Sequence, residues 1–346
     1  MNSLKMNELK KTFKNKDILV TGGCGSIGSE IVRQLVSYDV RRIRIFDHDE
    51  SGEFHLSEEL KEYKSIRPLI GDIRDKDRLK RAIRGVDIVF HAAALKHVPL
   101  CEYNPFEAVR TNVFGTQNLI NVAREEEIEK FLSISTDKAV NPINTMGATK
   151  LLSEKLVLNA SLGEYKTLFS CVRLGNVLNS NGSVIPIFLR QIKEGGPVTV
   201  TSREMTRFFM SMPDAVNLVL KAVSEMKGRE IFILKMKSIR IIDLASVMIE
   251  ELAPKFGYKP EDIEIKIIGV RPGEKLYECL LSEEEAQHVE ENGDMFILRP
   301  GILTPQFIGE EYGEAIGGEK YDSRKAEILS KDDIRKILYE EGIIID

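Results

Sequence analysis

Three consecutive residues, Thr136, Asp137 and Lys138, bring a hydroxyl, a carboxyl group and an amine together in the sequence. They follow an apolar run at residues 131–134 that predicts a buried β-strand. A second amine, Lys150, comes where a helix is expected to begin. An acid and an amine at the end of a strand suit a reaction with more proton transfers than a simple oxidation. We therefore take this segment as the candidate catalytic site.

Strand-like and helix-like segments alternate from residue 17 onward, and this alternation must position those side chains. The expected strands are 18–21, 43–46, 68–70, 88–91, 131–135 and 168–174, and the expected helices include 28–37, 77–83, 106–124 and 146–159. The pattern predicts an α/β fold with a Rossmann-type, doubly wound parallel sheet. A further strand near residues 230–236 is expected to rejoin the sheet.

Loop signals at residues 179–183 and 195–197 interrupt this alternation. We expect a polar N-terminal lead-in at residues 1–16 and the sheet domain at residues 17–178. Residues 179–346 are then mostly a smaller mixed α/β lobe with a C-terminal tail. The lobe is expected to be interleaved with the sheet domain, because no linker-like composition separates them.

Composition excludes several classes of function. The 346 residues carry a net charge of −5, which argues against a general binder of nucleic acid or of a membrane surface. The four cysteines form no CxxC pair and the five histidines form no i, i+4 pair, so the sequence predicts no metal site. The N-terminus has no apolar leader, and no run reaches the roughly 20 apolar residues of a membrane span. We expect a cytoplasmic protein.

A glycine-rich loop, Thr-Gly-Gly-Cys-Gly-Ser-Ile-Gly at residues 21–28, follows the first expected strand and opens a helix. Gly22, Gly25 and Gly28 let the backbone turn tightly and approach a pyrophosphate at the helix N-terminus, with Ser26 and Ile27 between them. Glycines also serve ordinary turns, but the strand before and the helix after favour dinucleotide binding. Residues 17–178 are therefore expected to be the cofactor-binding domain.

Asp47 ends the second expected strand, 19 residues after Gly28. A carboxylate there accepts from ribose hydroxyls and repels a 2′-phosphate, which favours NAD over NADP. Arginines at positions 41, 42 and 44 are the counterargument, although two of them fit the outward face of the strand. The other expected cofactor contacts are Asp72 and Ile73 near the adenine, where an acidic turn is the alternative, and the small residues Ala92, Ala93 and Ala94.

The glycine loop, the run from His91 to Ala94, Asn112 and the pairing of Thr136 with Lys150 resemble the extended short-chain dehydrogenase/reductases. Segments 92–105, 135–142 and 271–275 are similar to the UDP-N-acetylglucosamine 4,6-dehydratases of polysaccharide and pseudaminic-acid-type biosynthesis. The resemblance covers residues 17–300 and extends to the tail at 321–338. It implies an NAD that stays tightly bound and is regenerated in each turnover, with Asn112 in the cofactor site.

The resemblance also implies the chemistry: hydride leaves C4 of the sugar, water is lost across C5 and C6, and hydride returns to C6. Thr136 would orient the C4 oxygen, and Asp137 would protonate the departing C6 hydroxyl and is the candidate base for the C4 hydroxyl. Lys138 would be the C5 base, which requires a neutral amine. Burial and a nearby positive charge, from Lys150 or NAD, are expected to lower its pKa. Lys150 would hold the nicotinamide ribose.

Met146 departs from the wider superfamily, which carries a tyrosine four residues before the lysine. Two interpretations of this methionine are open. In the first, the enzyme is active, Met146 has a packing role and Asp137 replaces the tyrosine. In the second, the protein is an inactive enzyme. Retaining dehydratases usually pair Asp with Glu after the threonine, so Asp137-Lys138 points toward the subgroup with C5-inverting members. Some retaining members resemble the Asp-Lys pattern too, and C5 epimerisation therefore stays open.

The substrate implied is UDP-N-acetylglucosamine or a close UDP-amino-sugar. Asn176 and Arg271 would reach the diphosphate, because arginine suits bidentate phosphate contacts. Glu274 would accept from the uridine ribose, and Arg207 would lie near sugar or phosphate. Lys96 would reach the sugar or the nicotinamide ribose, although an ordinary surface charge explains it nearly as well.

Two other functions remain open: a nucleotide-sugar epimerase that never loses water, and a non-catalytic NAD-binding protein. Asp137-Lys138 argues against the epimerase, which needs neither group, and Met146 alone favours the non-catalytic protein. A homo-oligomer, a dimer or higher, is expected, since the apolar faces of helices 106–124 and 146–159 could meet a second copy. Packing on the sheet explains those faces equally well.

Overall fold

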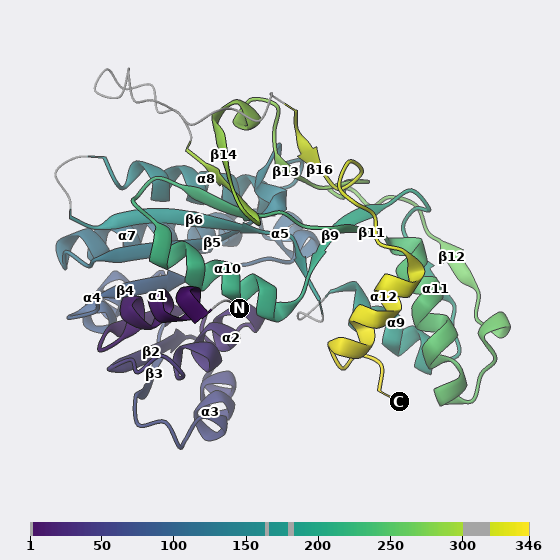
Figure 1. Cartoon of the computed structure of the whole chain (residues 1–346), viewed down its shortest axis with the longest axis horizontal. Coiled ribbons are helices and arrows are strands. Elements are labelled where there is room, and N and C mark those ends of the chain that lie inside the picture. The colour runs from purple at the N-terminus through teal and green to yellow at the C-terminus, as the bar shows by residue number, and fades with distance from the viewer. Residues whose placement is uncertain (1–2, 163–165, 179–182, 300–318, 346) are drawn as a thin grey trace.

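The computed structural model describes residues 3–162, 166–178, 183–299 and 319–345, and within them a nine-stranded sheet dominates the fold (Figure 1). From one edge to the other its strands are β14 (Val289–Asn292), β15 (Met295–Leu298), β10 (Ile231–Leu234), β6 (Leu168–Leu174), β5 (Lys130–Thr136), β4 (Ile88–His91), β1 (Asp17–Thr21), β2 (Arg42–Asp47) and β3 (Ile66–Ile70). The strands from β10 to β3 are parallel, and β15 and β14 add an antiparallel hairpin at the edge. The order 3-2-1-4-5-6 is that of a Rossmann fold.

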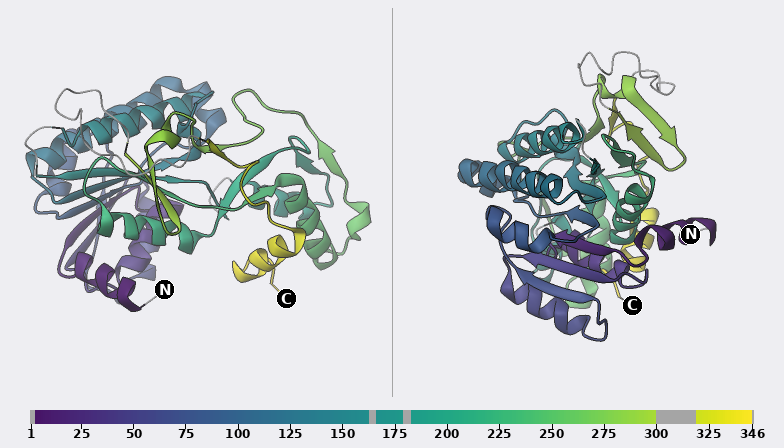
Figure 2. Two further views of the ribbon diagram at one scale, coloured as in Figure 1. Left: turned by 45° about the horizontal axis from the view of Figure 1, so that its top comes forward. Right: turned by 90° about the vertical axis from the view of Figure 1, so that its left-hand side faces the viewer.

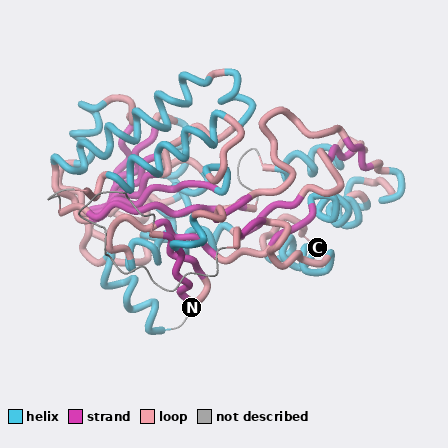
Figure 3. Tube along the Cα trace, turned by 90° about the horizontal axis from the view of Figure 1, so that it is seen from above, coloured by secondary structure: helices cyan, strands magenta, loops and turns pink. Residues whose placement is uncertain are grey.

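Helices cover both faces of this sheet (Figures 2 and 3). One face carries α1 (Ser3–Phe13), α2 (Ser26–Leu35), α3 (Glu50–Glu59) and α10 (Met212–Glu225). The other carries α4 (Lys76–Ile83), α5 (Val98–Tyr103), α6 (Pro105–Ala108), the π-helix η1 (Val109–Gly115), α7 (Thr116–Glu125) and α8 (Thr145–Asn159). A short 3₁₀ turn, η2 (Asp137–Ala139), follows β5. The predicted doubly wound sheet is thus confirmed, and β10 rejoins it as expected.

Two elements differ from the sequence pattern. The helix expected at 106–124 is continuous from α6 to α7 but passes through η1, where the backbone carbonyl of Asn112 accepts from Thr116 Oγ1 at 2.7 Å and from Ser153 Oγ. The polar lead-in contains α1, whose Phe13 is fully buried beside Tyr38. Polar composition hid this helix because only one side of it reaches the core.

A smaller lobe is built on a second apolar core (Figure 1). Its elements are β7 (Asn176–Val177), α9 (Val184–Lys193), β8 (Val198–Val200), β9 (Thr206–Met210), β11 (Ser238–Arg240), α11 (Ile241–Leu252), η3 (Pro254–Phe256), η4 (Pro260–Asp262), β12 (Ile265–Ile267) and α12 (Lys331–Glu340). Between the lobes run β13 (Cys279–Leu281), η5 (Glu285–His288) and β16 (Tyr321–Asp322). Segments of the second half of the chain, including α10, β10 and β15, pack in the main core. The two lobes therefore share the chain after residue 178.

None of the helices in the described ranges is long and apolar enough to cross a bilayer. The cytoplasmic location expected from the sequence stays a prediction.

Candidate active site

A cavity of about 730 Å³ opens at the carboxyl ends of β1, β2, β3 and β4. Ligands of open α/β sheets bind at this edge, where the strand order reverses between β1 and β4. Eight of the predicted cofactor residues line it: Gly22, Gly25, Asp47, Asp72, Ile73, Ala92, Ala93 and Ala94. Ser26, Ile27 and Gly28 form the first turn of α2, next to the glycine loop.

Two glycines of the loop are required by close backbone approaches. Gly22 has φ +68°, and a Cβ there would lie 2.5 Å from the backbone nitrogen of Ala93. A Cβ on Gly28 would lie 2.1 Å from the carbonyl oxygen of Gly22. The loop therefore packs backbone to backbone against the segment after β4. The N-terminus of α2, with its positive dipole end, begins directly behind it at Ser26.

Asp47 is held rigidly at the end of β2. Its carboxylate accepts from the backbone N–H groups of Cys24 at 2.9 Å, His48 at 2.8 Å and Asp49 at 3.2 Å. The first of these bonds ties Asp47 to the glycine loop. A fixed carboxylate facing the cavity is the feature that recognises ribose hydroxyls.

The three arginines near β2 are bound elsewhere. Arg41 and Arg42 pair with the buried carboxylate of Asp17, at 2.5 and 3.0 Å. Arg44 donates to the carbonyls of Ala82 at 2.6 Å and Arg84 at 2.8 Å. These contacts direct the three guanidinium groups away from Asp47. The sequence counterargument for NADP therefore loses its geometric basis.

Asp72, at the adenine end of the cavity, is paired. Its carboxylate accepts from Arg74 at 2.6 Å, and this contact holds the pKa of Asp72 below its usual range. Arg74 also reaches Glu107 at 2.8 Å. Ile73 is buried against Gly115 of η1. This end of the cavity is thus closed by an ion-paired turn and one apolar side chain.

A buried histidine fastens β4 to its neighbours. His91 Nδ1 lies 2.8 Å from Thr21 Oγ1, and Nε2 lies 2.9 Å from Thr116 Oγ1. Because Thr116 donates its own proton to the carbonyl of Asn112, its oxygen accepts from His91 Nε2. Burial lowers the pKa of His91 to about 3, so the ring is neutral. His91 is a structural residue at the floor of the site.

Asn112 acts on the loop after β4. Its side-chain oxygen accepts from the backbone N–H of Leu95 at 2.8 Å, and its Nδ2 donates to the carbonyl of Leu95 at 2.9 Å and to Thr149 Oγ1 at 3.0 Å. The amide is 1% exposed. Asn112 therefore shapes the loop that carries Ala94 and Lys96, and its place in the cofactor site stays a prediction.

The candidate reacting groups cluster at the end of β5, one strand beyond the cavity. Asp137 is fully buried, and its Oδ1 accepts from Thr136 Oγ1 at 2.8 Å and from Lys138 Nζ at 3.0 Å. Asp137 Oδ2 is also buried and has no hydrogen-bond partner in the described part of the chain. The hydroxyl of Thr136 and the amine of Lys138 thus share one oxygen of the Asp137 carboxylate.

A fourth group of this cluster, Glu278, escaped sequence reasoning. It precedes β13, is 2% exposed, and its Oε1 lies 3.5 Å from Lys138 Nζ and 3.8 Å from Arg207 Nε. Its other oxygen is buried without a partner among the described residues. The available signal was a charged residue directly before the apolar run 279–281. That signal gives no hint of a contact with Lys138, which lies 140 positions earlier.

The expected lowering of the Lys138 pKa is wrong. Burial does lower it, but the negative charges of Asp137 and Glu278 outweigh burial, and the pKa of Lys138 lies above its ordinary value. Lys150, expected to act on it, points elsewhere and donates to the carbonyl of Ile134 at 2.6 Å. Burial lowers the pKa of Lys150 itself. Lys138 therefore rests as an ammonium ion between two carboxylates.

Met146 is 3% exposed and packs against Cys101 and Ala108 in a small apolar cluster. Its backbone carbonyl accepts from Thr149 Oγ1 at 2.8 Å. The position that bears a tyrosine in the wider superfamily thus serves packing here, and Asp137 is the acid–base group nearest to Thr136.

The predicted substrate residues fall into two groups. Asn176 accepts from Lys138 Nζ at 3.3 Å, and Arg207 donates to the carbonyls of Lys275 at 2.8 Å and Leu276 at 3.2 Å, so both lie in the reacting cluster. Glu274 is partly buried and lies 3.8 Å from Arg207, and Arg271 and Lys96 are exposed. Asn144, the N-cap of α8, donates to the carbonyl of Gly273 at 2.8 Å. The 271–278 segment is thereby fixed over the end of β5.

The family model of the polysaccharide biosynthesis proteins matches residues 18–300. The chain belongs to that family. The match spans the Rossmann sheet, the reacting cluster and the 271–278 segment. It confirms the predicted resemblance over residues 18–300, and the expected extension to residues 321–338 lies outside the match.

Family relatives carry several names. An uncharacterized membrane protein of Methanocaldococcus jannaschii is 61% identical over 96% of this chain and 98% of its own length. An inverting UDP-N-acetylglucosamine 4,6-dehydratase of Campylobacter jejuni is 42% identical over 89% of this chain and 90% of its own. A UDP-glucose 4-epimerase of Rickettsia canadensis is 41% identical over 94% and 96%. The chain spans about half, 48%, of the capsular polysaccharide biosynthesis protein CapD of Staphylococcus aureus.

Solved structures agree with this assignment. The X-ray structure of Pen from Bacillus thuringiensis has a TM-score of 0.90 and 42% identity, covering 96% of this chain and 99% of that one. A dTDP-glucose 4,6-dehydratase from Streptomyces venezuelae, solved with NAD, has a TM-score of 0.67 and 23% identity over 75% of this chain and 86% of that one, and shares the fold. This family member therefore has the architecture of nucleotide-sugar dehydratases and epimerases.

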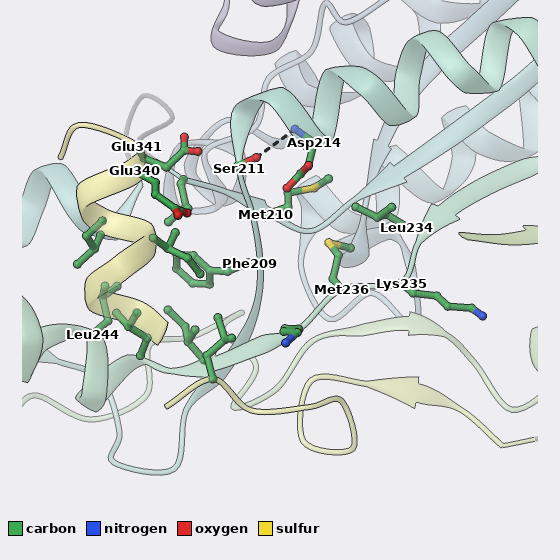
Figure 4. A pocket seen from close by; sticks show the side chains of 17 residues that line it. Phe209, Met210, Ser211, Asp214, Leu234, Lys235, Met236, Leu244, Glu340 and Glu341 are labelled. Atoms are coloured by element: carbon green, nitrogen blue, oxygen red, sulfur yellow. Dashed lines mark hydrogen bonds between the residues drawn. The ribbon is translucent and has the colours of Figure 1, made fainter. Parts of the chain in front are cut away.

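A second cavity, of about 310 Å³, lies between the lobes (Figure 4). Its walls are mostly apolar, with Phe209, Met210 and Met236 on one side and α12 on the other. Carboxylates also line it, among them Asp214, whose backbone N–H donates to Ser211 Oγ at 3.1 Å. None of the predicted site residues lines this cavity.

Proposed function

We propose that this protein is an NAD-dependent UDP-N-acetylglucosamine 4,6-dehydratase, a hydro-lyase that acts on that nucleotide sugar or a close UDP-amino-sugar. The observation that carries the proposal is the buried oxygen of Asp137 shared by Thr136 and Lys138, at 2.8 and 3.0 Å. A hydroxyl to orient, an acid–base carboxylate and an amine are the groups that oxidation at C4 and elimination at C5–C6 require. The name of the Campylobacter relative supports the same reaction.

Each residue of the cluster has a role in the proposed reaction. Thr136 orients the C4 hydroxyl, and Asp137 takes its proton as the C4 hydride departs. Asp137 then gives that proton to the departing C6 oxygen, which leaves as water, while Lys138 holds the proton from C5 and later returns it to C5. Thr136, Asp137 and Lys138 end each turnover in their starting states, and the sugar has lost one water. Lys150 of α8, which is buried and donates to the carbonyl of Ile134 at 2.6 Å, would hold the nicotinamide ribose.

NAD is the cofactor that suits the cavity best. When bound, it supplies a hydride acceptor for C4 and a hydride donor for C6. The glycine loop would approach its pyrophosphate, and the fixed Asp47 carboxylate would accept from its ribose hydroxyls. Asp47 would repel a 2′-phosphate, and the contacts of the neighbouring arginines direct them elsewhere. These features favour NAD over NADP.

An epimerase that stops at the 4-keto stage is the second candidate. The observation in its favour is the 41% identity to a protein named UDP-glucose 4-epimerase. Simple 4-epimerisation breaks no C5–H bond, so it leaves the Asp137–Lys138–Glu278 arrangement without a task. We therefore rank it below the dehydratase.

A homo-oligomer is the assembly we propose, with α6, η1 and α8 at the interface. Phe106, Phe114 and Leu152 on these elements are 65%, 55% and 51% exposed. Large apolar side chains gathered on one side of a molecule mark interaction surfaces. Sedimentation of the purified protein measures its mass directly, and a monomer at working concentration would contradict this assembly.

The decisive experiment is to incubate the purified protein with UDP-N-acetylglucosamine, without added NAD, in deuterated water and to follow the sugar by NMR. A 6-deoxy-4-keto sugar supports the dehydratase and the tightly bound cofactor, and its ring couplings report whether C5 is inverted. A product changed only in configuration at C4 supports the epimerase. No product, even with NAD supplied, refutes UDP-N-acetylglucosamine as the substrate and favours another nucleotide sugar or the non-catalytic NAD-binding protein.

Asp137→Asn tests the acid in the same assay. The amide keeps the shape but neither takes nor gives a proton, so kcat should fall by roughly 10²–10⁴. Asp214→Asn, in the second cavity, is the matched control and should leave kcat unchanged. Unaltered turnover in Asp137→Asn contradicts the role given to this carboxyl group.

A further inference from the structure

The proposed reaction does not yet say which group accepts the proton that Lys138 carries at rest. Lys138 must be a neutral amine when it takes the proton from C5, yet it rests as an ammonium ion. The Lys138 side chain is 24% exposed, but its Nζ is hydrogen-bonded to Asp137 and Asn176, so protein groups are its direct neighbours. A carboxylate next to Nζ is therefore the nearest group that could hold the proton while Lys138 is neutral.

Four charged or titratable groups and one amide surround Lys138 in the described part of the chain. They are Asp137 in η2, Glu278 before β13, Arg207 in β9 and Lys275 in the segment before β13, together with the uncharged amide of Asn176. Arg207 and Lys275 are cations. Asp137 carries the C4 proton at this stage of the proposed reaction. Among the residues that the structure describes, Glu278 is the acceptor that remains.

The position and the burial of Glu278 suit it to accept the proton of Lys138. Its Oε1 lies 3.5 Å from Lys138 Nζ, and its Oε2 is buried with no partner in the described segments. Burial raises the pKa of Glu278, despite the opposing charges of Lys138 and Arg207. The backbone fixes it in place, since Glu278 N–H donates to Ser323 Oγ at 3.1 Å and its carbonyl accepts from Ser323 N–H at 2.9 Å.

We propose that Glu278 is a positioning residue that takes the proton of Lys138 before C5 is deprotonated and returns it at the end of the turnover. The step is Lys138–NH₃⁺ plus Glu278–COO⁻ giving Lys138–NH₂ plus Glu278–COOH. Oxidation at C4 favours it, because the proton received by Asp137 removes one of the two carboxylate charges that hold Lys138 protonated. The inference rests on the proposed dehydratase and deepens it, since Glu278 acts through Lys138.

The test is the pH dependence of kcat for Glu278→Gln with UDP-N-acetylglucosamine, using the full-length protein. The wild type passes the proton internally, so its kcat should vary little between about pH 6.5 and 8.5. The variant must release the Lys138 proton to solvent, so its kcat should fall about a hundredfold near pH 7 and rise nearly tenfold per pH unit above it. Glu278→Asp restores a carboxyl group and should restore the flat profile, even at a reduced rate.

Two controls separate this role from a structural one. Glu283→Gln changes an exposed carboxylate in the loop after β13 and should match the wild type at every pH. A Glu278→Gln variant that loses the same factor at all pH values has lost only structure, and this result overturns the proposal. So does a variant with the wild-type rate and profile.

A second measurement needs no turnover. Labelling of the Lys138 amine with acetic anhydride, followed by mass spectrometry, reports its protonation as the pH is raised. Loss of the Glu278 charge should move this titration to lower pH, and an unmoved titration overturns the link between the two residues. If the wild type makes no 6-deoxy-4-keto product, the proposed function fails while the labelling still decides whether Glu278 controls the Lys138 proton.

Discussion

The buried arginine of β6 provides the sharpest test of how the site is held. Arg173 is 1% exposed and makes five hydrogen bonds: two to Glu154 of α8, at 2.9 and 2.7 Å, two to Glu285 of η5, at 3.0 and 2.7 Å, and one to the carbonyl of Leu280 in β13, at 3.1 Å. These bonds fasten β13, and with it the Glu278 that precedes it, to the main sheet. Arg173→Met keeps a flexible, unbranched apolar side chain and removes every one of these hydrogen bonds.

The loss of unfolding free energy in Arg173→Met can be estimated from the two carboxylates that lose their partner, Glu154 and Glu285. Glu154 is 2% exposed and would remain as an uncompensated buried charge, which typically costs about 3–5 kcal/mol. Glu285 has a side chain 22% exposed, so water screens it and it adds little. Arg173→Met should therefore lower the free energy of unfolding by about 3–5 kcal/mol near neutral pH. Adding Glu154→Leu removes the stranded charge and should recover most of this loss.

The penalty should depend on pH with a definite sign. In the wild type, burial raises the pKa of Glu285, but Arg173 outweighs burial and keeps that pKa below its ordinary value. Glu285 thus adds stability above its unfolded pKa and loses it as the pH falls. In Arg173→Met only the backbone N–H of Ser282 and the charge of Lys155 still oppose burial, so the folded-state pKa of Glu285 rises and the variant loses less stability than the wild type as the pH falls. The penalty should therefore shrink as the pH falls toward the ordinary pKa of a glutamate.

Urea unfolding of the wild type, Arg173→Met and the double variant, at about pH 7 and about pH 4.5, measures these differences. Arg335→Met is the matched control: Arg335 also contacts three carboxylates, at 2.6 to 2.9 Å, but its side chain is 31% exposed. Arg335→Met should lower the free energy of unfolding by less than about 1 kcal/mol. An Arg173→Met penalty as small as that of the control, or one that does not change with pH, refutes the reasoning.

The cofactor site gives two further expectations. Gly22→Ala places a Cβ 2.5 Å from the backbone of Ala93 at a φ of +68°, so the purified variant should carry less NAD, measured by absorbance after denaturation, and should unfold about 1–3 kcal/mol more easily. Asp47→Asn keeps the shape of the side chain but weakens the acceptor for ribose hydroxyls, so NAD should bind about tenfold more weakly by calorimetry, whereas an equal or tighter NAD affinity would contradict the role of Asp47.

Local patterns predicted the sheet well because each strand has its own signal. The apolar runs ending at Thr21, His91 and Thr136 are strands buried on both faces, and the glycines at 22 and 28 mark a turn that no other residue fits. The same patterns gave no view of α1, whose buried Phe13 stands among lysines, or of the π-turn in η1. Both depend on which tertiary partner a side chain meets, and that partner lies far away in the sequence.

The residues of the reacting cluster also differ in how well the sequence predicted them. Thr136, Asp137 and Lys138 were found because they are adjacent in the sequence, and adjacency brought them to one oxygen. Glu278 was missed because its contact with Lys138 spans both lobes and depends on the 271–278 segment folding back over β5. The sequence alone therefore does not show that Glu278 and Lys138 lie close together in space.

That missing carboxylate also explains why the charge state of Lys138 was predicted with the wrong sign. Burial alone lowers the pKa of an amine, and this was the term visible in the sequence. Two carboxylates at 3.0 and 3.5 Å reverse the balance, so the resting amine is charged. A charged amine cannot remove a proton from carbon until its own proton has moved. The group that prevents Lys138 from acting at rest is thus the group best placed to release it, which is why Glu278 belongs to the chemistry of the site and not only to its structure.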